Sequence, residues 1–571
     1  MALKDKAKNY LMPLWIGLAA AYILLILPRM SKPILGWEAM VCWQIPREIA
    51  AHGYAAVKFF KLPPLYDSLI AASFKIFGIS EISARLTGMI CFLIMPVMIY
   101  LLVKEMTEEK DTLPVAFIAS AIFCTAPLII QGSLLIDRSD TTILTFALTL
   151  FYLALLKTEG RPLAYRVASL GALYAVCLWV KVTTPLACLA AVPLAYILCG
   201  RIKYGILFSL GVFISGITLF AITWGAFCFF LVGMSRFFEP LGYYGAAASG
   251  TVLALKSGLL TRIILDLFRV YLWFSPLLLM LGALAAFTVF KRLLREPAAA
   301  IKDTQLLIFI GVVAAGYLYT NATFSGFPKY VAPVMPMLAC VIAKFVWEKI
   351  GKGFGGKELF LIALSFSAGV AYYIMFVKDW VYVVYALRQA QSVGMAGSAI
   401  PGAIYQQALY LLFPAVVFFL SLLMIPGPLI KKLALVLFVC LVAGNVALDI
   451  MQRNAAYAVN FGYGTEGAEE LRAFLKAKQP TDVFSSIEGY VANVGDVRFR
   501  GIDADVWNDP GKFLAFMKRY GPECLIYGLG VNTASQIRGT MDIQAVRAYL
   551  KNGYDSRAIG SYNILLKRGD H

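Results

Sequence analysis

Ionisable side chains stand at a few places where an otherwise apolar chain leaves its hydrophobic segments. Asp137, Arg138 and Asp140 are crowded between two such segments. Desolvating charged groups at the end of a membrane span is costly, so a cluster of this kind more often marks a functional site. An interfacial ion pair is the simpler alternative.

Other charges could join this cluster. Glu38 lies between Trp37 and Ala39 in an apolar setting. Low solvation near a membrane would raise the basicity of its carboxylate, although a solvated surface carboxylate is the plainer interpretation. Lys181 and Lys329 also stand at span ends, where snorkelling to lipid headgroups would explain them. Converging on one cavity, the acids could activate a hydroxyl and the bases could hold an anionic phosphate.

The elements that must position these residues are membrane helices. Of the 571 residues, 60% are hydrophobic and 15% are charged, against about 25% charged in a soluble protein. Apolar segments long enough to cross a bilayer must be helical, because lipid offers the backbone no hydrogen bonds. Thirteen spans are predicted: 11–28, 83–103, 113–130, 140–157, 163–180, 183–199, 205–232, 268–290, 303–320, 329–347, 358–377, 404–425 and 430–450.

The basic residues predict the orientation of these spans. With a cytoplasmic N-terminus, every second loop carries Lys and Arg and the alternate short loops are poor in both, as the positive-inside rule requires. The basic loops hold Lys104/Lys110, Lys157/Arg161/Arg166, Arg201/Lys203, Lys291/Arg292/Arg295/Lys302, Lys349/Lys352/Lys357 and Lys431/Lys432. The net charge of +18 is thus explained without a nucleic-acid partner, and an inner (plasma) membrane location is predicted.

The fold class predicted is mainly α, a polytopic helical membrane protein with a small extracytoplasmic α/β domain at its C-terminus. Residues 1–454 form the transmembrane domain, with a long first outer loop at 29–82, and residues 455–571 form the α/β domain. In the loop, apolar residues recur every fourth position from Trp37 to Ile49, and Pro46 predicts an interruption that leaves two short helices.

Local signals predict the elements of the α/β domain. Its helices are expected at 465–478 behind a Thr465 cap, from Pro510 behind Asp509, and at 542–553. Strands are expected at 483–485, 525–527 and 563–566.

Four stretches, in order along the chain, resemble a known family, the C-type membrane glycosyltransferases, in the branch of protein O-mannosyltransferases and the lipid A aminoarabinose transferase. They are Trp37-Glu38-Ala39 with Pro46-Arg47-Glu48-Ile49, Pro63-Pro64-Leu65-Tyr66 with Phe77-Gly78 and Ala84-Arg85-Leu86, Asp140-Thr141-Thr142, and Lys329-Tyr330 with Pro333 and Pro336. Thirteen spans followed by an outer domain also resemble the aminoarabinose transferase.

Two departures from the family pattern limit what the resemblance assigns. The family opens its first motif with Asp-Glu, whereas Trp37 precedes Glu38 here, so either Glu38 takes the part of the catalytic Asp or the alignment shifts by one residue. Lys61-Leu62 stands where aminoarabinose transferases carry Glu-Lys, which leaves the sugar unassigned.

The resemblance implies an inverting transfer of a sugar from a polyprenyl-phosphate donor to a lipid A-like, protein or cell-envelope glycan acceptor on the outer face of the membrane. Glu38 would act as general base, and Asp140 would orient the acceptor or share that task. The residues expected to bind substrate or phosphate are Lys61, Arg138, Lys329, Tyr330, Tyr66, Asp137 and, more weakly, Lys181. No cofactor is predicted; a divalent metal is conceivable, but His52 and His571 do not make a site.

A transporter or flippase of lipid-linked sugars is the main alternative, and a structural or assembly role is a third. Transporters tend to show repeated halves with broken spans at matching positions. No such repeat is visible in this sequence.

Overall fold

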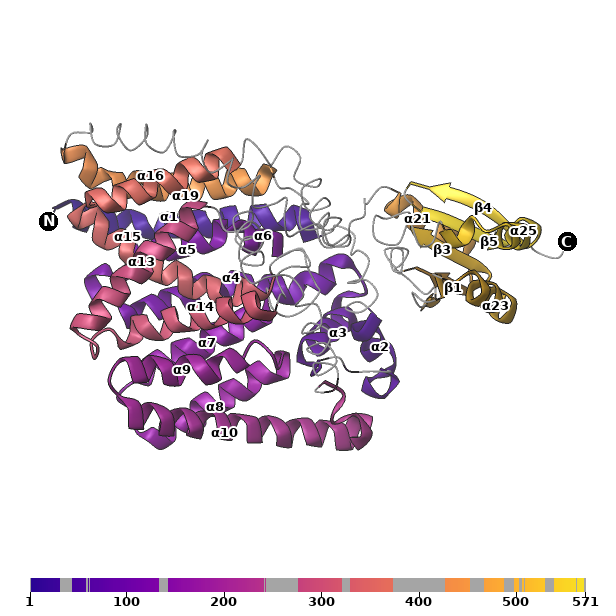
Figure 1. The fold of residues 1–571 in the computed structure, drawn as a ribbon, viewed down its shortest axis with the longest axis horizontal. Helices are drawn as coiled ribbons and strands as arrows, with labels where there is room; N and C mark the ends of the chain where they lie inside the picture. The colour runs from indigo at the N-terminus through magenta and orange to yellow at the C-terminus, as the bar shows by residue number, and fades with distance from the viewer. Residues whose placement is uncertain are drawn as a thin grey trace.

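The protein is a helical bundle with a small mixed sheet beyond one of its ends (Figure 1). The computed structural model describes residues 2–30, 44–57, 60, 62–132, 142–240, 242, 276–320, 329–372, 427–451, 467–486, 498–502, 506–507, 509–528, 539–560 and 562–568. The N-terminus lies at the opposite end of the bundle from the sheet. We call these the far end and the sheet-side end.

Long apolar helices run between the two ends. They are α1 (Ala2–Met30), α4 (Glu81–Met106), α5 (Glu109–Thr125), α7 (Ile143–Lys157), α8 (Leu163–Val180), α9 (Leu186–Leu198), α10 (Ile202–Phe227), α13 (Pro276–Arg295), α14 (Ile301–Thr320), α15 (Met335–Lys352), α16 (Gly356–Tyr372) and α19 (Gly427–Met451). Among the described residues, five helices are long and apolar enough to cross a membrane, and four shorter apolar ones accompany them. The predicted polytopic fold is confirmed.

The structure corrects some predicted spans. The span at 113–130 is two helices, because the chain is extended at Ala126 before α6 (Pro127–Gly132). A residue before proline is pushed out of the helical region, which explains this break. The span at 329–347 opens with a 3-10 helix, η6 (Lys329–Val334), and α10 continues as a π-helical turn, η4 (Cys228–Val232). The span at 404–425 lies outside the described residues.

The first loop between spans forms a cap of short helices on the sheet-side end. It contains α2 (Gln44–His52), η2 (Tyr54–Ala56) and α3 (Leu65–Phe77). Pro46 lies in the first turn of α2, where its missing N–H has no intrahelical partner to lose. Residues 37–43 lie outside the described part of the chain, so the predicted interruption of a longer helix stays a prediction. An apolar cluster that includes Ile49 and Phe60 packs the cap against Trp224 and Cys228 of α10 and η4.

Close backbone contact joins α8 to α10. A Cβ atom at Gly216 would lie 2.8 Å from the carbonyl oxygen of Gly171 and 2.8 Å from a ring carbon of Tyr174. The absence of a side chain at Gly216 therefore lets two helices meet that would otherwise be held apart, the use that membrane bundles make of small residues.

The sheet has five strands in the order β2-β1-β3-β5-β4. They are β1 (Asp482–Ser485), β2 (Arg498–Gly501), β3 (Cys524–Gly528), β4 (Tyr554–Ile559) and β5 (Tyr562–Lys567). β1 pairs in parallel with β2 and β3, whereas β5 pairs antiparallel with β3 and β4. Three helices, α21 (Ala468–Lys478), α23 (Pro510–Tyr520) and α25 (Gln544–Gly553), accompany the sheet. The mixed α/β character predicted for this region is confirmed.

Two helix starts differ from the prediction. α21 begins after Gly467, which is in the left-handed conformation, and not behind a Thr465 cap. A Cβ atom at Gly467 would come within 2.7 Å of the Ile559 carbonyl oxygen, so this close approach to the turn between β4 and β5 requires glycine. α25 begins at Gln544 instead of 542. Asp509 caps α23 as expected, accepting hydrogen bonds from the N–H groups of Gly511 and Lys512.

One ion pair ties the sheet region to the bundle. Arg472 of α21 lies 2.6 Å from the carboxylate of Glu81, the first residue of α4. Leu471 and Leu475 of the same helix belong to the large apolar cluster that also contains the bundle core. α21 is therefore the element that docks the sheet onto the sheet-side end.

The Gly216 contact gives a test of the packing. Gly216→Ala should lower the free energy of unfolding by about 1–3 kcal/mol, because the new methyl group meets a backbone atom that has no room to move. Gly311→Ala in α14 is the matched control: nothing lies within 4 Å of its added Cβ, and a gain of about 0.5–1 kcal/mol is expected. Thermal unfolding in detergent measures both; equal shifts of the two variants would contradict the packing described.

Candidate functional site

A buried lysine defines the candidate site at the sheet-side end. Lys181 follows the last residue of α8, and its extended backbone ends that helix. The residue is 4% exposed, and its ammonium group lies 4.2 Å from the centre of the Tyr330 ring. A buried cation needs compensation, and an aromatic face supplies part of it. This contact joins two of the predicted site residues from segments that are far apart in the sequence.

The α3 helix places a second predicted residue beside this end. Tyr66, in the first turn of α3 behind Pro63-Pro64, is buried. Ser68 donates from its hydroxyl to the Pro64 carbonyl oxygen at 2.5 Å and accepts from the Tyr54 hydroxyl at 2.9 Å, which fixes the start of α3 against η2. α3 also contacts α8, the helix that ends at Lys181.

The starts of α4 and α7 meet at the same end. A Cβ atom at Gly88 of α4 would lie 2.8 Å from the Thr142 methyl group, so the two backbones are in close contact there. One turn earlier, Arg85 is buried and donates to the Met30 carbonyl oxygen at 2.8 Å, which holds the end of α1. η6, which carries Tyr330, contacts both α6 and α7. Thr142 comes two residues after Asp140, so the start of α7 brings that segment of the chain to this end.

The described residues bring three predicted site residues, Lys181, Tyr330 and Tyr66, to one end of the bundle. Of Lys329, only the backbone in η6 is described. The other predicted residues lie outside the described part of the chain: Glu38, Lys61, Asp137, Arg138 and Asp140. The meeting of Glu38 with Asp140 therefore stays a prediction.

Asp67 is a residue of this end that sequence reasoning missed. It follows Tyr66 in the first turn of α3, a short helix that is not among the candidate membrane spans. Burial raises the pKa of its carboxyl group from 3.8 to about 7. The signal in the sequence is its place directly after Pro-Pro-Leu-Tyr, where a carboxyl group enters an otherwise apolar helix.

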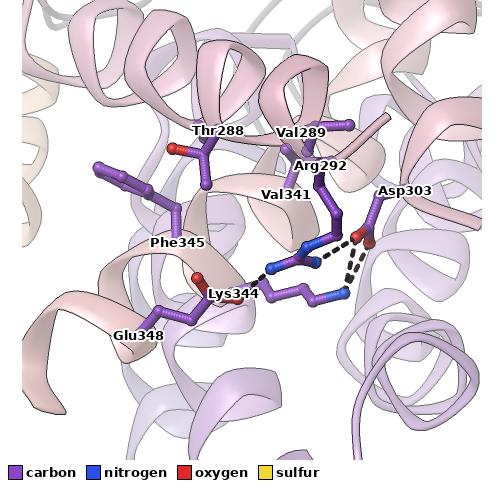
Figure 2. Close-up of a pocket in the computed structure, with 9 residues that line it drawn as sticks. Thr288, Val289, Arg292, Asp303, Val341, Lys344, Phe345 and Glu348 are labelled. Atoms are coloured by element: carbon purple, nitrogen blue, oxygen red, sulfur yellow. Dashed lines mark hydrogen bonds and ion pairs between the residues drawn. The ribbon is translucent and has the colours of Figure 1, made fainter. Parts of the chain in front are cut away.

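A small pocket lies among the described residues at the far end (Figure 2). Arg292 lies 2.9 Å from Asp303 and 2.8 Å from Glu348, and Lys344 lies 2.8 Å from Asp303. Two cations and two carboxylates thus compensate one another. The pocket is a structural junction of α13, α14 and α15, and none of the predicted site residues lines it.

No three metal-ligating side chains come together within the part of the chain that the structure describes. The charged groups described at the sheet-side end include the buried Lys181, the Asp67 carboxyl group and the Arg472–Glu81 ion pair. Their arrangement fits the binding of an anionic, phosphate-bearing molecule next to hydroxyl-bearing side chains.

Known proteins resemble this chain both in sequence and in fold. Residues 61–227 match the family described as dolichyl-phosphate-mannose-protein mannosyltransferase. The whole fold is similar to that of ArnT from Cupriavidus metallidurans bound to undecaprenyl phosphate, with a TM-score of 0.54 and 14% identity over 97% of this chain and 98% of that chain. At this identity the likeness to ArnT shows a shared fold, and the family match adds a sequence likeness over residues 61–227.

A second solved structure shares the architecture. The oligosaccharyltransferase of Archaeoglobus fulgidus, tethered to an acceptor peptide, has a TM-score of 0.53 and 12% identity over 98% of this chain and 74% of that chain. At these identities the similarity establishes the fold, and the predicted family resemblance is confirmed. No curated protein matches by sequence.

The pKa of Asp67 predicts a pH dependence of this protein's stability. Between pH 3.8 and about 7 the unfolded chain ionises at Asp67 while the folded protein keeps the proton. The folded state then binds more protons, so this residue's contribution falls as pH rises through that window and is constant above it. Asp67→Asn should remove that decline when thermal unfolding is measured from pH 4 to about 8. Parallel pH profiles for the variant and the wild type would contradict the burial of this carboxyl group.

Proposed function

We propose that this C-type glycosyltransferase moves a sugar, with inversion, from a polyprenyl-phosphate donor to an acceptor at the outer face of the membrane. The observation that carries the proposal is the Lys181–Tyr330 contact. It joins the end of α8 to η6 at the sheet-side end, where α3 and the starts of α4 and α7 also lie. Three of the four motif-bearing stretches therefore converge at one end of the bundle.

In this proposal the donor phosphate binds near Lys181. A cation that is 4% exposed gains more from a phosphate than a solvated cation does, because the interaction is screened less. Lys329 of η6, Lys61 before α3 and Arg138 before α7 flank the same elements in sequence, so they are the candidates to neutralise the departing phosphate. Tyr66 and Tyr330 would orient the donor, and Asp137 would add a hydrogen-bond acceptor.

The reaction forms one bond between an acceptor oxygen and the anomeric carbon of the sugar. It breaks the bond between that carbon and the phosphate oxygen, and the polyprenyl phosphate leaves with the bonding electrons. The acceptor proton goes to Glu38 as general base, while Asp140 orients the acceptor. Positioning and charge stabilisation would supply most of the rate enhancement, since phosphate is already a good leaving group.

The orientation also belongs to the proposal. The loops rich in Lys and Arg follow α4, α7, α9, α13 and α15 at the far end (Figure 1). The positive-inside rule assigns that end to the cytoplasm. The sheet-side end and an α/β domain of residues 455–571, separate from a membrane domain of residues 1–454, then face the outside, where a lipid, glycan or protein acceptor would be met.

Reconstituted vesicles distinguish transfer from transport. Purified protein is supplied with a panel of synthetic undecaprenyl-phosphate sugars, and mass spectrometry follows the lipid. Release of free undecaprenyl phosphate together with a glycosylated acceptor supports the proposal. Unaltered donor that appears only in the opposite leaflet would contradict it and favour a flippase.

The general base gives a direct prediction. Glu38→Gln should lower turnover by about 10²–10⁴-fold, because the acceptor proton loses its acceptor while donor binding is unchanged. Glu109→Gln, exposed at the far end, is the matched control and should leave turnover at the wild-type rate. Steady-state kinetics with donor titration measure both. Wild-type turnover in the Glu38 variant would remove this residue from the mechanism.

Lys181 gives a second prediction. Lys181→Met keeps the stem length but removes the charge, so the KM for the donor should rise by roughly tenfold or more, in line with about 1.5–3 kcal/mol for a hydrogen bond to a charged group. Lys157→Met, exposed at the far end, should have no effect. Donor titration of both variants is the measurement. An unchanged KM in Lys181→Met would restrict this lysine to a packing role.

A further inference from the structure

A buried polar pair links α19, the last described helix of the bundle, to α6, the short helix that precedes residues 133–141. The side-chain amide of Gln131 in α6 donates to the carboxylate of Asp449 in α19 at 2.7 Å. Both residues are fully buried, at 0% exposure. Burying a carboxylate in a membrane bundle is costly, so its presence there calls for a function.

The position of α6 is not set by the helix before it. α5 ends at Thr125, and Ala126 is extended, which breaks the helical path before Pro127. α6 is only six residues long, so it cannot hold its own direction as a free helix. The bond to Asp449 fixes its last turn against α19. The chain then continues directly into residues 133–141, which carry Asp137, Arg138 and Asp140.

α6 also contacts η6, the element that carries Tyr330. A continuous set of contacts therefore runs from Asp449 through Gln131 to α6, on to η6, and from Tyr330 to Lys181. The cover over Lys181 therefore depends on where α6 lies.

We propose that the Gln131–Asp449 pair is a positioning pair: by holding α6 against α19, it places η6 over Lys181 for the transfer reaction. Neither residue touches the donor or acceptor. The proposal rests on the proposed function for its catalytic part. Its structural part, the placement of η6 over Lys181, stands without that function.

The remaining acceptor atoms of this cluster suggest which variants to make. Among the described residues, no donor reaches Gln131 Oε1 or Asn445 Oδ1. Asp449→Asn keeps an oxygen for the Gln131 amide and adds a donor for Gln131 Oε1, so it preserves the pair without the charge. Gln131→Leu with Asp449→Leu removes the amide and the carboxylate together, so neither is left buried opposite an apolar side chain at the other position.

A second polar contact between nearby parts of the same helices provides a matched control. Asn445 donates to the Thr125 hydroxyl at 3.4 Å, one turn earlier in α19 and before the break at Ala126. Thr125→Val with Asn445→Leu also removes a buried polar pair, but it leaves the tie beyond the break intact. Any general effect of polar removal on the bundle appears in this control.

Two readouts on the full-length protein in vesicles test the pair. The first is kcat with the undecaprenyl-phosphate sugar that the wild type turns over. The second is the rate at which an amine-reactive ester modifies Lys181, followed by peptide mass spectrometry. The double leucine variant should lose roughly tenfold to hundredfold in kcat, as expected of a small misplacement. Its Lys181 should be modified faster than that of the wild type. Asp449→Asn and the Thr125/Asn445 control should match the wild type in both.

Either a wild-type kcat or an unchanged Lys181 reactivity in the double leucine variant would overturn the proposal. An equal loss in the Thr125/Asn445 control would also overturn it, because the effect would then be general to the helix pair. If the wild type turns over no donor, the proposed function fails, and the Lys181 reactivity still decides whether the pair positions η6.

Discussion

The Lys181 ammonium group, buried beneath the Tyr330 ring, is the interaction on which the candidate site depends. It fixes the end of α8 against η6, and through η6 against α6 and α7. A cation in so apolar a place is stable only if nearby groups compensate its charge, and the ring does this in part. The proposed function places the donor phosphate beside this cation.

Apart from the Arg472–Glu81 pair, the charges named at the two ends of the bundle are compensated in different ways. At the far end, cations meet carboxylates in pairs: Arg292 and Lys344 share Asp303, and Arg201 bonds to Glu159 at 2.7 Å. Those ion pairs hold helices together. At the sheet-side end the described Lys181 is matched by an aromatic ring, and the Asp67 carboxyl group keeps its proton to a higher pH than usual because it is desolvated. This difference is one reason why we propose the reactive site at the sheet-side end.

Much of the fold could be predicted because membrane helices are recognisable in a sequence by their length and apolar composition. The span predicted at 163–180 agrees with α8, and other span ends differ by a few residues where charged residues extend a helix, as Arg292 and Arg295 do in α13. The strands predicted at 483–485, 525–527 and 563–566 all lie in the sheet. The sequence analysis did not predict β2 and β4, which are the two edge strands of the sheet. Edge strands face solvent and carry charged residues such as Arg498 and Arg557, so they show no apolar run to recognise.

Part of the site was predictable because the ends of the apolar spans can be located in the sequence. Lys181, Tyr66 and Tyr330 stand at span ends or in motifs, and alternation of the spans brings such ends together. Asp67 was missed because its burial comes from packing that no local pattern reveals. Gln131 and Asp449 are separated by 318 positions. A pairing between such distant polar residues leaves no local trace in a single sequence.

The central claim is that Glu38 and Asp140 meet at the sheet-side end. Spin labels on cysteines at 38 and 140, in protein reconstituted into bilayers, measure it by pulsed electron paramagnetic resonance. Labels at 38 and 109 serve as the reference, because Glu109 begins α5 at the far end. The account predicts a 38–140 distance far shorter than the 38–109 distance, which should approach the bilayer core thickness of about 30 Å. Comparable distances for the two pairs would contradict the account.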